Sequence, residues 1–251
     1  MNEVNPKTGP MPESVTLGDT SVHPFESLDA IVSSILPAGR RVIPGVGIAI
    51  NPEKIVRARD DADLRATLDK ATIRFADGIG VVWALRRRGV RAVRLAGVDR
   101  WYRLMQEAAR SGRDVFLLGG EPGVVDEVSS RLRAALPGIQ IVGSSHGFID
   151  MEAEGDIARA LLASSPEVVA VAMGSPRQEK VIARLRTVYP DAFYLGVGGT
   201  FDVYAGRVKR APVWMQRSGL EWLYRLLKQP SRAGRQKNLI RFVGLELSGH
   251  L

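Results

Sequence analysis

The chain has 251 residues and a formal net charge of +8, with 45% hydrophobic and 25% charged residues, as is typical of a globular α/β protein with an appendage. It contains no cysteine, which excludes disulfides and thiolate metal sites and suits a reducing cytoplasm. No run of about 18 apolar residues occurs, so we expect no membrane-spanning helix.

The N-terminal part of the chain begins with a polar segment and continues with apolar residues at regular spacing. Residues 1–20 are polar and Pro-rich and lack the apolar stretch of a signal peptide, so we expect them to be disordered. Residues 25–36 carry apolar side chains at helical spacing and predict a helix. An apolar run, 42–50, predicts a strand, and Asn51 before Pro52 is typical of the start of a helix.

From residue 72 onward, short apolar runs alternate with segments of helical period. The expected strands are 72–76, 115–120, 139–142, 168–174 and 192–199, and the expected helices are 78–89, 98–110, 122–135, 152–163 and 176–188. This alternation predicts an α/β fold, a Rossmann-like and mostly parallel sheet with helices on both faces. We assign this core to residues 21–205.

Glycines and unusual polar residues gather in the loops that follow the expected strands. In an open parallel sheet, ligands bind at the carboxyl ends of the strands. The loops concerned are Ala49–Asn51, Ala76–Gly80, Gly119–Gly123, Gly174–Glu179 and Gly196–Asp202. Their shared position predicts a single substrate site.

Three of these loops could contact a phosphate or a sugar. Gly119 and Gly120 precede a helix, where glycines and free N–H groups can hold a phosphate, although a tight turn without a ligand has the same pattern. The G-x-G-x-x-G spacing is missing, so we expect no nicotinamide cofactor and assign no cofactor at all. Further candidates for contact with a phosphate or a sugar are Arg177, Gln178, Gly198 and Asp202.

Asp77 is the candidate catalytic residue. It follows a strand and precedes Gly78, which leaves space beside the carboxylate, so Asp77 could act as a general base toward a hydroxyl. On the local sequence alone, however, the N-cap of the next helix is the favoured interpretation, because Asp is a preferred N-cap residue. Asp61 and Asp63 form a D-x-D pattern but follow no strand, and we interpret them as acids at a helix start. The three histidines are scattered, so we expect no metal site.

The positive charge of the chain is concentrated at its C-terminal end. Residues 206–251 contain ten Lys and Arg against two acids, a surplus equal to that of the whole chain. Leucines at 220, 223, 226 and 227 fall on one helical stripe flanked by basic residues, the pattern of an interfacial amphipathic helix. The same pattern also fits a helix that packs on the core with its charges in solvent. We assign 206–251 as a basic helical appendage, and an anionic partner is expected.

Taken together, these motifs resemble one bacterial family, the WecG/TagA/CpsF glycosyltransferases. The resemblance covers residues 40–240 in the right order. It is carried by Asn51, the loop ADGIG at 76–80, RLAGVD at 94–99, FLLGG with Pro122-Gly123, GSPRQE, GVGGTFD, AGRVKRAP and GLEWLYRLLKQPSR.

The resemblance implies an inverting, metal-independent transfer of a sugar, with N-acetylmannosamine as the best candidate, from a UDP-sugar to a polyprenyl-diphosphate-linked sugar. It implies that Asp77 is the base and that Asn51, Arg94 and Gln178 line the sugar and diphosphate pocket. The arginines of the appendage, Arg225, Arg232 and Arg235, would then hold the lipid diphosphate. Many relatives have Thr where this chain has Ala49, which leaves the donor sugar open.

We therefore expect a peripheral enzyme on the cytoplasmic face of a bacterial inner membrane, acting in cell-wall or exopolysaccharide synthesis. One alternative keeps the fold but uses UDP-glucose or another UDP-hexose in exopolysaccharide assembly. A second alternative is a non-enzymatic protein that binds nucleic acid through the basic segment. For the glycosyltransferase that we expect, no nucleic-acid partner is predicted. Whether the chain forms a homo-oligomer stays open.

Overall fold

A computed structural model describes residues 11–228 and 233–251, except for the side chains at positions 151, 225 and 233–236. Its secondary structure forms a two-stranded sheet, β1-β2, and a six-stranded sheet with the strand order β4-β3-β8-β7-β5-β6. The described residues divide into two compact units. Unit 1 consists mainly of Ser27–Ile48 and Gly97–Val208, and unit 2 of Pro12–Glu26, Ala49–Ala96 and Lys209–Leu251.

Unit 1 contains most of the large sheet. Its strands are β3 (Gly45–Ile50, whose last two residues belong to unit 2), β5 (Asp114–Gly119), β6 (Gln140–Ser145), β7 (Val168–Ala172) and β8 (Phe193–Gly196). The neighbouring pairs β3–β8, β8–β7, β7–β5 and β5–β6 are all parallel. Every residue of β7 is buried, as expected for a central parallel strand covered on both faces.

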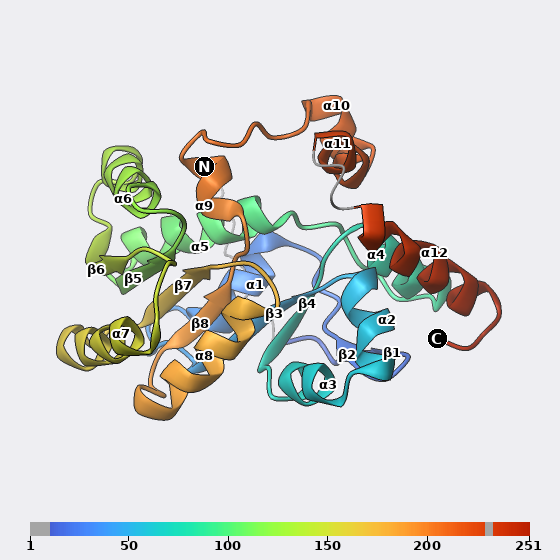
Figure 1. Ribbon diagram of the computed structural model, residues 1–251, viewed down its shortest axis with the longest axis horizontal. Coiled ribbons are helices and arrows are strands. Elements are labelled where there is room, and N and C mark those ends of the chain that lie inside the picture. Colours follow the sequence, from blue (N-terminus) through green and yellow to red (C-terminus); the bar gives the residue numbers. More distant parts are fainter. Residues whose placement is uncertain (1–10, 229–232) are drawn as a thin grey trace, which may run out of the picture. The chain divides into compact units, whose positions relative to one another are not determined.

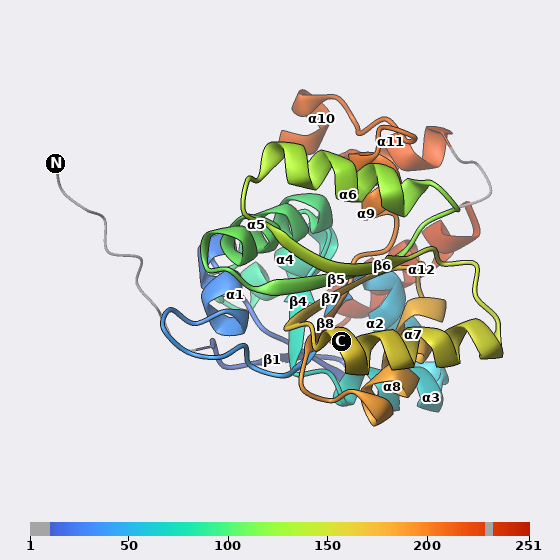
Figure 2. The same cartoon turned by 90° about the vertical axis from the view of Figure 1, so that its left-hand side faces the viewer.

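The helices of unit 1 cover both faces of this sheet. They are α1 (Leu28–Ile35), α5 (Gly97–Arg110), α6 (Val124–Ala135), α7 (Met151–Ser164), α8 (Arg177–Val188) and α9 (Thr200–Tyr204). Helices α5 and α6 lie on one face and α7 and α8 on the other (Figure 2). The predicted α/β fold, with a mostly parallel sheet covered by helices, is therefore confirmed, and each predicted strand matches an observed one within four residues.

Unit 2 is built around the remaining strands and the C-terminal helices. It contains β1 (Val15–Leu17), β2 (Thr20–Val22), α2 (Pro52–Asp60), α3 (Ala62–Asp69), β4 (Ile73–Ala76), α4 (Ile79–Arg87), α10 (Val213–Arg217), α11 (Glu221–Lys228) and α12 (Ala233–Leu247). Helix α12 packs on α2 and α4 (Figure 1). Phe242 of α12 is completely buried, so the basic segment contributes to the apolar core of this unit.

The beginning of the chain differs from the prediction. Strands β1 and β2 form an antiparallel pair with Val15 opposite Val22, inside and next to the segment 1–20 that was expected to be disordered. Leu17 and Val22 are fully buried, and this burial explains the order of the hairpin. The expected boundary between a core ending at residue 205 and an appendage beginning at residue 206 stays a prediction, because packing does not measure whether a segment folds independently.

Candidate active site

In unit 1, glycines bring the ends of β5 and β7 close together. Gly119 has a φ of +132°, and a Cβ atom there would lie 2.3 Å from the backbone oxygen of Ala172. The N–H of Gly120 donates to that oxygen at 2.9 Å, and Gly120 in turn accepts a 2.8 Å bond from the N–H of Gly147. Only glycine allows so close an approach of two backbones. The loop after β5 is thus fixed at the carboxyl end of the sheet, where α6 begins.

Gln178 fixes the neighbouring loop. Its side chain is buried, and its Oε1 atom accepts a 2.9 Å hydrogen bond from the N–H of Gly198. A Cβ atom at Gly196 would lie 2.6 Å from Nε2 of Gln178, so β8 ends directly against this amide. The structure therefore brings Gln178 and Gly198 together, as the prediction of a common site requires, and gives Gln178 a role in holding the loop.

Asp202 lines a cavity of about 430 Å³ in unit 1, whose walls are Glu121, Pro122, Val124, Asp202, Arg207 and Val208. Burial raises the pKa of the Asp202 carboxyl above its usual value, and the charge of Glu121 raises it further. Two carboxylates can accept hydrogen bonds from neighbouring hydroxyl groups, while the Arg207 guanidinium can bind an anion. This combination suits a hydroxyl-rich ligand that carries phosphate.

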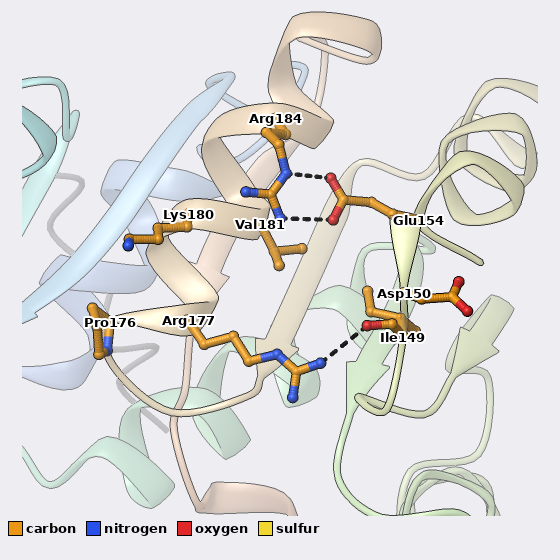
Figure 3. Close-up of a pocket in the computed structure, with 8 residues that line it drawn as sticks. All are labelled: Ile149, Asp150, Glu154, Pro176, Arg177, Lys180, Val181 and Arg184. Carbon is orange, nitrogen blue, oxygen red and sulfur yellow. Dashed lines mark hydrogen bonds and ion pairs between the residues drawn. The ribbon is translucent and has the colours of Figure 1, made fainter. Parts of the chain in front are cut away.

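Arg177 has a partner of its own, although it is adjacent to Gln178 in the chain. It lines a second cavity, also of about 430 Å³, together with residues of α7 and α8 (Figure 3). Its Nη2 atom donates to the carbonyl oxygen of Ile149 at 3.2 Å. In the same cavity, Arg184 binds Glu154 through two hydrogen bonds of 2.6 and 2.7 Å (Figure 3). The two predicted contacts of this helix start therefore have different partners, Ile149 for Arg177 and Gly198 for Gln178.

In unit 2, Asp77 follows β4, and its N–H donates to the carbonyl oxygen of Ile50 at 2.8 Å. The N-cap of α4 is Gly78, with a φ of +80°, and no side chain caps this helix. The interpretation that the local sequence favoured, Asp77 as the cap of this helix, is therefore wrong. Within the part of the chain that the structure describes, the Asp77 carboxylate has no hydrogen bond or ion pair that holds it in a structural role.

Asn51 lies next to this loop, because β3 and β4 end side by side. It caps α2 as predicted, with its Oδ1 atom accepting a 2.9 Å bond from the N–H of Lys54. The buried Lys54 ammonium donates to the carbonyl oxygen of Ala49 at 2.9 Å. A Cβ atom at Gly78 would lie 4.0 Å from Cδ of Pro52. The structure thus places Asn51, Asp77 and Gly78 together at the end of these two strands.

Arg94 lies in the loop before α5 and binds the basic segment. Its Nη1 atom donates to the carbonyl oxygen of Gln216 at 2.9 Å, and its Nη2 atom forms an ion pair with Glu221. Glu221 is also 3.3 Å from Nε of Arg210. The predicted phosphate-binding arginine is therefore held by the end of α10 and the first residue of α11, and we call the stretch 216–221 the α10–α11 turn.

Helix α12 packs directly beside the Asp77 loop. A Cβ atom at Gly80 would lie 2.8 Å from Pro52, 3.7 Å from Phe242 and 3.8 Å from Leu239. The first turn of α4 thus lies between α2 and α12. Of the three arginines predicted to bind the lipid diphosphate, Arg225 belongs to α11 and Arg235 to α12. The side chains of both, and the whole of Arg232, lie outside the described residues.

Several large apolar side chains of the C-terminal helices are exposed. Trp214 of α10 is 62% exposed and Ile240 of α12 is 74% exposed, and the others are Val213, Trp222, Leu227, Val243 and Leu247. In the residues that the structure describes, no helix is long and apolar enough to span a membrane. The exposed side chains alternate with lysines and arginines in the sequence, which is the composition of a surface that can bind at an interface.

The D-x-D pattern has the structural role predicted for it. Asp61 is the N-cap of α3 and accepts a 2.9 Å hydrogen bond from the N–H of Leu64. Among the residues whose placement is described, no three His, Asp or Glu side chains gather as a metal-binding group.

The sequence prediction missed Glu121, Arg207 and Glu221. Glu121 stands inside the glycine loop after β5, and Arg207 follows α9, so both were within motifs that had been recognised. Glu221 is one of two acids in a segment with ten basic residues, and that isolation was the available signal. A count of charges shows such an acid but not its partners, which depend on how the segment folds back.

Comparison with models of protein families gives one match that covers nearly the whole chain. The model described as the glycosyl transferase WecG/TagA/CpsF family matches residues 15–250. The matched range begins at β1 and includes α12, so it contains both the loops after the parallel strands and the basic segment.

Proposed function

The chain belongs to the WecG/TagA/CpsF family of glycosyltransferases, and we propose that it transfers a sugar, N-acetylmannosamine in the first instance, from a UDP-sugar to a polyprenyl-diphosphate-linked sugar. The family membership makes it an enzyme of cell-surface polysaccharide synthesis that uses a sugar-nucleotide donor and a lipid-linked acceptor. The alternative of a non-enzymatic nucleic-acid-binding protein is thereby overturned.

The donor nucleotide is assigned to the glycine loop and the Asp202 cavity of unit 1. The N-terminus of α6 follows Gly119 and Gly120 and offers N–H groups to a phosphate. Asp202 and Glu121 can accept hydrogen bonds from ribose hydroxyls. Gln178 and Gly198, which are bonded to each other, are assigned to the same donor. Arg177 is assigned to it on the resemblance of the GSPRQE motif alone, since its own contacts lie at the second cavity.

The reaction is assigned to Asp77. Its carboxylate would take the proton of the acceptor hydroxyl while the hydroxyl oxygen attacks the anomeric carbon and the bond from that carbon to the diphosphate oxygen breaks. Attack on the side opposite the leaving group inverts the configuration. The observation that carries this assignment is that Gly78, and not Asp77, caps α4, which leaves a strand-end carboxylate for chemistry.

The leaving diphosphate must be stabilised as negative charge develops on it. In a reaction without a metal, guanidinium groups and helix N-termini supply that stabilisation. We assign Arg94 to the diphosphate and Asn51 to the sugar. The contacts that support this assignment are those of the two side chains in unit 2: Asn51 adjoins the Asp77 loop through Ile50 and Pro52, and Arg94 is fixed by the α10–α11 turn.

The basic segment is assigned to the acceptor and to the membrane. Its exposed Trp214, Leu227 and Ile240 would enter the interface of an anionic bilayer while lysines and arginines bind phosphate groups. Arg225, Arg232 and Arg235 are assigned to the acceptor diphosphate. In this proposal the enzyme acts as a peripheral protein on the cytoplasmic face of the bacterial cell membrane.

A second donor keeps the same reaction. Ala49 stands where many relatives have Thr, and its carbonyl oxygen is bound by Lys54. Loss of a hydroxyl there changes what the site can offer a sugar, so UDP-glucose or another UDP-hexose in exopolysaccharide assembly is the alternative.

A panel of donors tests the proposal. The purified chain is incubated with a polyprenyl-diphosphate-linked N-acetylglucosamine acceptor and, separately, with UDP-N-acetylmannosamine, UDP-N-acetylglucosamine, UDP-glucose and UDP-galactose. Mass spectrometry should detect a lipid product heavier by one N-acetylhexosamine with the first donor. A hexose product would select the alternative, and no product with any UDP-sugar would refute the proposed donor class.

A further inference from the structure

The basic segment contains two acids, and the structure buries both of them. Glu221 is 7% exposed and Glu246 is 6% exposed, in a segment otherwise rich in lysine and arginine. A buried carboxylate is costly unless charged partners and hydrogen bonds compensate it. The partners of these two acids therefore indicate where the segment is attached to the rest of unit 2.

Glu246 joins α12 to the C-terminal end of α4. Both of its carboxylate oxygens accept from Nη1 of Arg88, at 2.8 and 2.7 Å, and Nε of Arg87 lies 3.4 Å away. Arg87 and Arg88 end α4, and no function is assigned to either. This ion pair anchors the helix.

Glu221 has a similar set of partners at a different place. One carboxylate oxygen pairs with Nη2 of Arg94 and the other lies 3.3 Å from Nε of Arg210. Arg94 also donates from Nη1 to the carbonyl oxygen of Gln216 at 2.9 Å. A guanidinium is planar and its donors have fixed directions. Contacts at both terminal nitrogens therefore fix the plane of the Arg94 guanidinium.

The turn that holds Arg94 also rests on the Asp77 loop. Gly219, between α10 and α11, has a φ of +74°, and a Cβ atom there would lie 3.3 Å from two carbon atoms of Ile79. Ile79 is the first residue of α4 and stands two positions after Asp77. One short turn thus contacts both the start of α4 and the guanidinium of Arg94.

We propose that Glu221 is a positioning residue that orients Arg94 toward the donor diphosphate, so that donor binding depends on the docking of the α10–α11 turn. The proposal rests on the proposed function, which assigns Arg94 to the diphosphate. Glu221 itself does not touch substrate in this account. It acts through Arg94, with the Gln216 carbonyl as the second point of attachment.

Calorimetric titration with UDP tests this role in the full chain. Glu221→Gln keeps the size of the side chain and removes its charge, and it should weaken UDP binding about tenfold, the loss expected when a charge-assisted contact is misplaced. Glu246→Gln is the matched control, because it removes the other buried carboxylate. It should lower the melting temperature by a similar amount and leave the Kd for UDP within about twofold of wild type.

A double variant shows whether Glu221 acts through Arg94. Arg94→Ala should weaken UDP binding at least as much as Glu221→Gln, and the two changes together should be no worse than Arg94→Ala alone. If Glu221→Gln proves unfolded by circular dichroism, Arg94→Lys replaces it in the test. That variant keeps the ion pair but loses the fork, and it should weaken UDP binding about tenfold.

Three results would overturn the role of Glu221. The first is a Kd for UDP within twofold of wild type in Glu221→Gln or, where that variant is unfolded, in Arg94→Lys. The second is a loss of UDP affinity in the double variant that equals the sum of the two single losses. The third is a loss of UDP affinity in Glu246→Gln as large as that in Glu221→Gln. Absence of UDP binding by the wild-type chain is a different outcome. It would reject the proposed donor, and the role of Glu221 with it.

Discussion

Helix α12 offers a direct comparison between a buried side chain that stabilises the fold and an exposed one that we propose binds the membrane. Phe242 is completely buried, whereas Ile240, two positions earlier, is 74% exposed. Truncation of a buried phenylalanine to alanine costs about 3–5 kcal/mol, because apolar contacts are lost and a cavity remains. For a chain of this size, that cost corresponds to a fall in melting temperature of roughly 6–20 °C.

Thermal unfolding followed by circular dichroism should show this fall for Phe242→Ala. Ile240→Ser should change the unfolding free energy by no more than about 0.5 kcal/mol, as is usual for an exposed site, but it should weaken cosedimentation with anionic liposomes. A melting temperature unchanged by Phe242→Ala, or lowered as much by Ile240→Ser, would show that the two faces of α12 have been assigned wrongly.

Three further predictions concern the site and the surface. Activity should survive EDTA, since the leaving group is assigned to arginines and helix N-termini; loss in EDTA with recovery in Mg²⁺ or Mn²⁺ would contradict this. Burial raises the pKa of Asp202 in the folded state, so its ionised form lowers the free energy of unfolding at neutral pH. In urea unfolding, Asp202→Asn should therefore be more stable than wild type at pH 7, and the difference should vanish below about pH 4, where the carboxyl is protonated in both states. In calorimetry, the same variant should bind UDP more weakly than wild type. Liposome binding should weaken steeply between about 0.05 and 0.5 M NaCl, because salt screens exposed cations; a salt-independent affinity would leave only the apolar side chains to explain it.

The parts of the fold that could be predicted from the sequence are those with a local cause. The buried strand β7 is a continuous apolar run, and Asn51 before Pro52 carries its own capping signal; both predictions are confirmed. The hairpin of β1 and β2 was missed because each strand has three residues, too few for a periodic pattern. Its order comes from the burial of Leu17 and Val22 against the rest of unit 2, which is not a local property.

For the candidate site, the sequence predicted which loops carry polar residues but not the partners of those residues. Strand-helix alternation and glycine loops predicted that polar residues would gather at the carboxyl ends of the strands. Within unit 1, Gln178 lies with Gly198, and within unit 2, Asn51 lies with Asp77. The local sequence favoured Asp77 as the cap of α4, and only the family resemblance favoured catalysis. The structure has Gly78 at the cap, since Asp and Gly are both accepted at that position. The partners of Glu221 lie 127 residues away at Arg94 and nearby at Arg210, and only the fold of the basic segment brings all three together.

The central claim is that Asp77 is the catalytic base of a glycosyltransferase, and the turnover of Asp77→Asn tests it most directly. With the donor and acceptor that the panel identifies, kcat should fall by about 10²–10⁴, while calorimetry finds UDP bound as in wild type. Asp61→Asn is the matched control, because Asn also caps a helix and α3 should keep its start, so turnover should not change. An Asp77→Asn enzyme that retains more than about one hundredth of wild-type kcat would contradict the account.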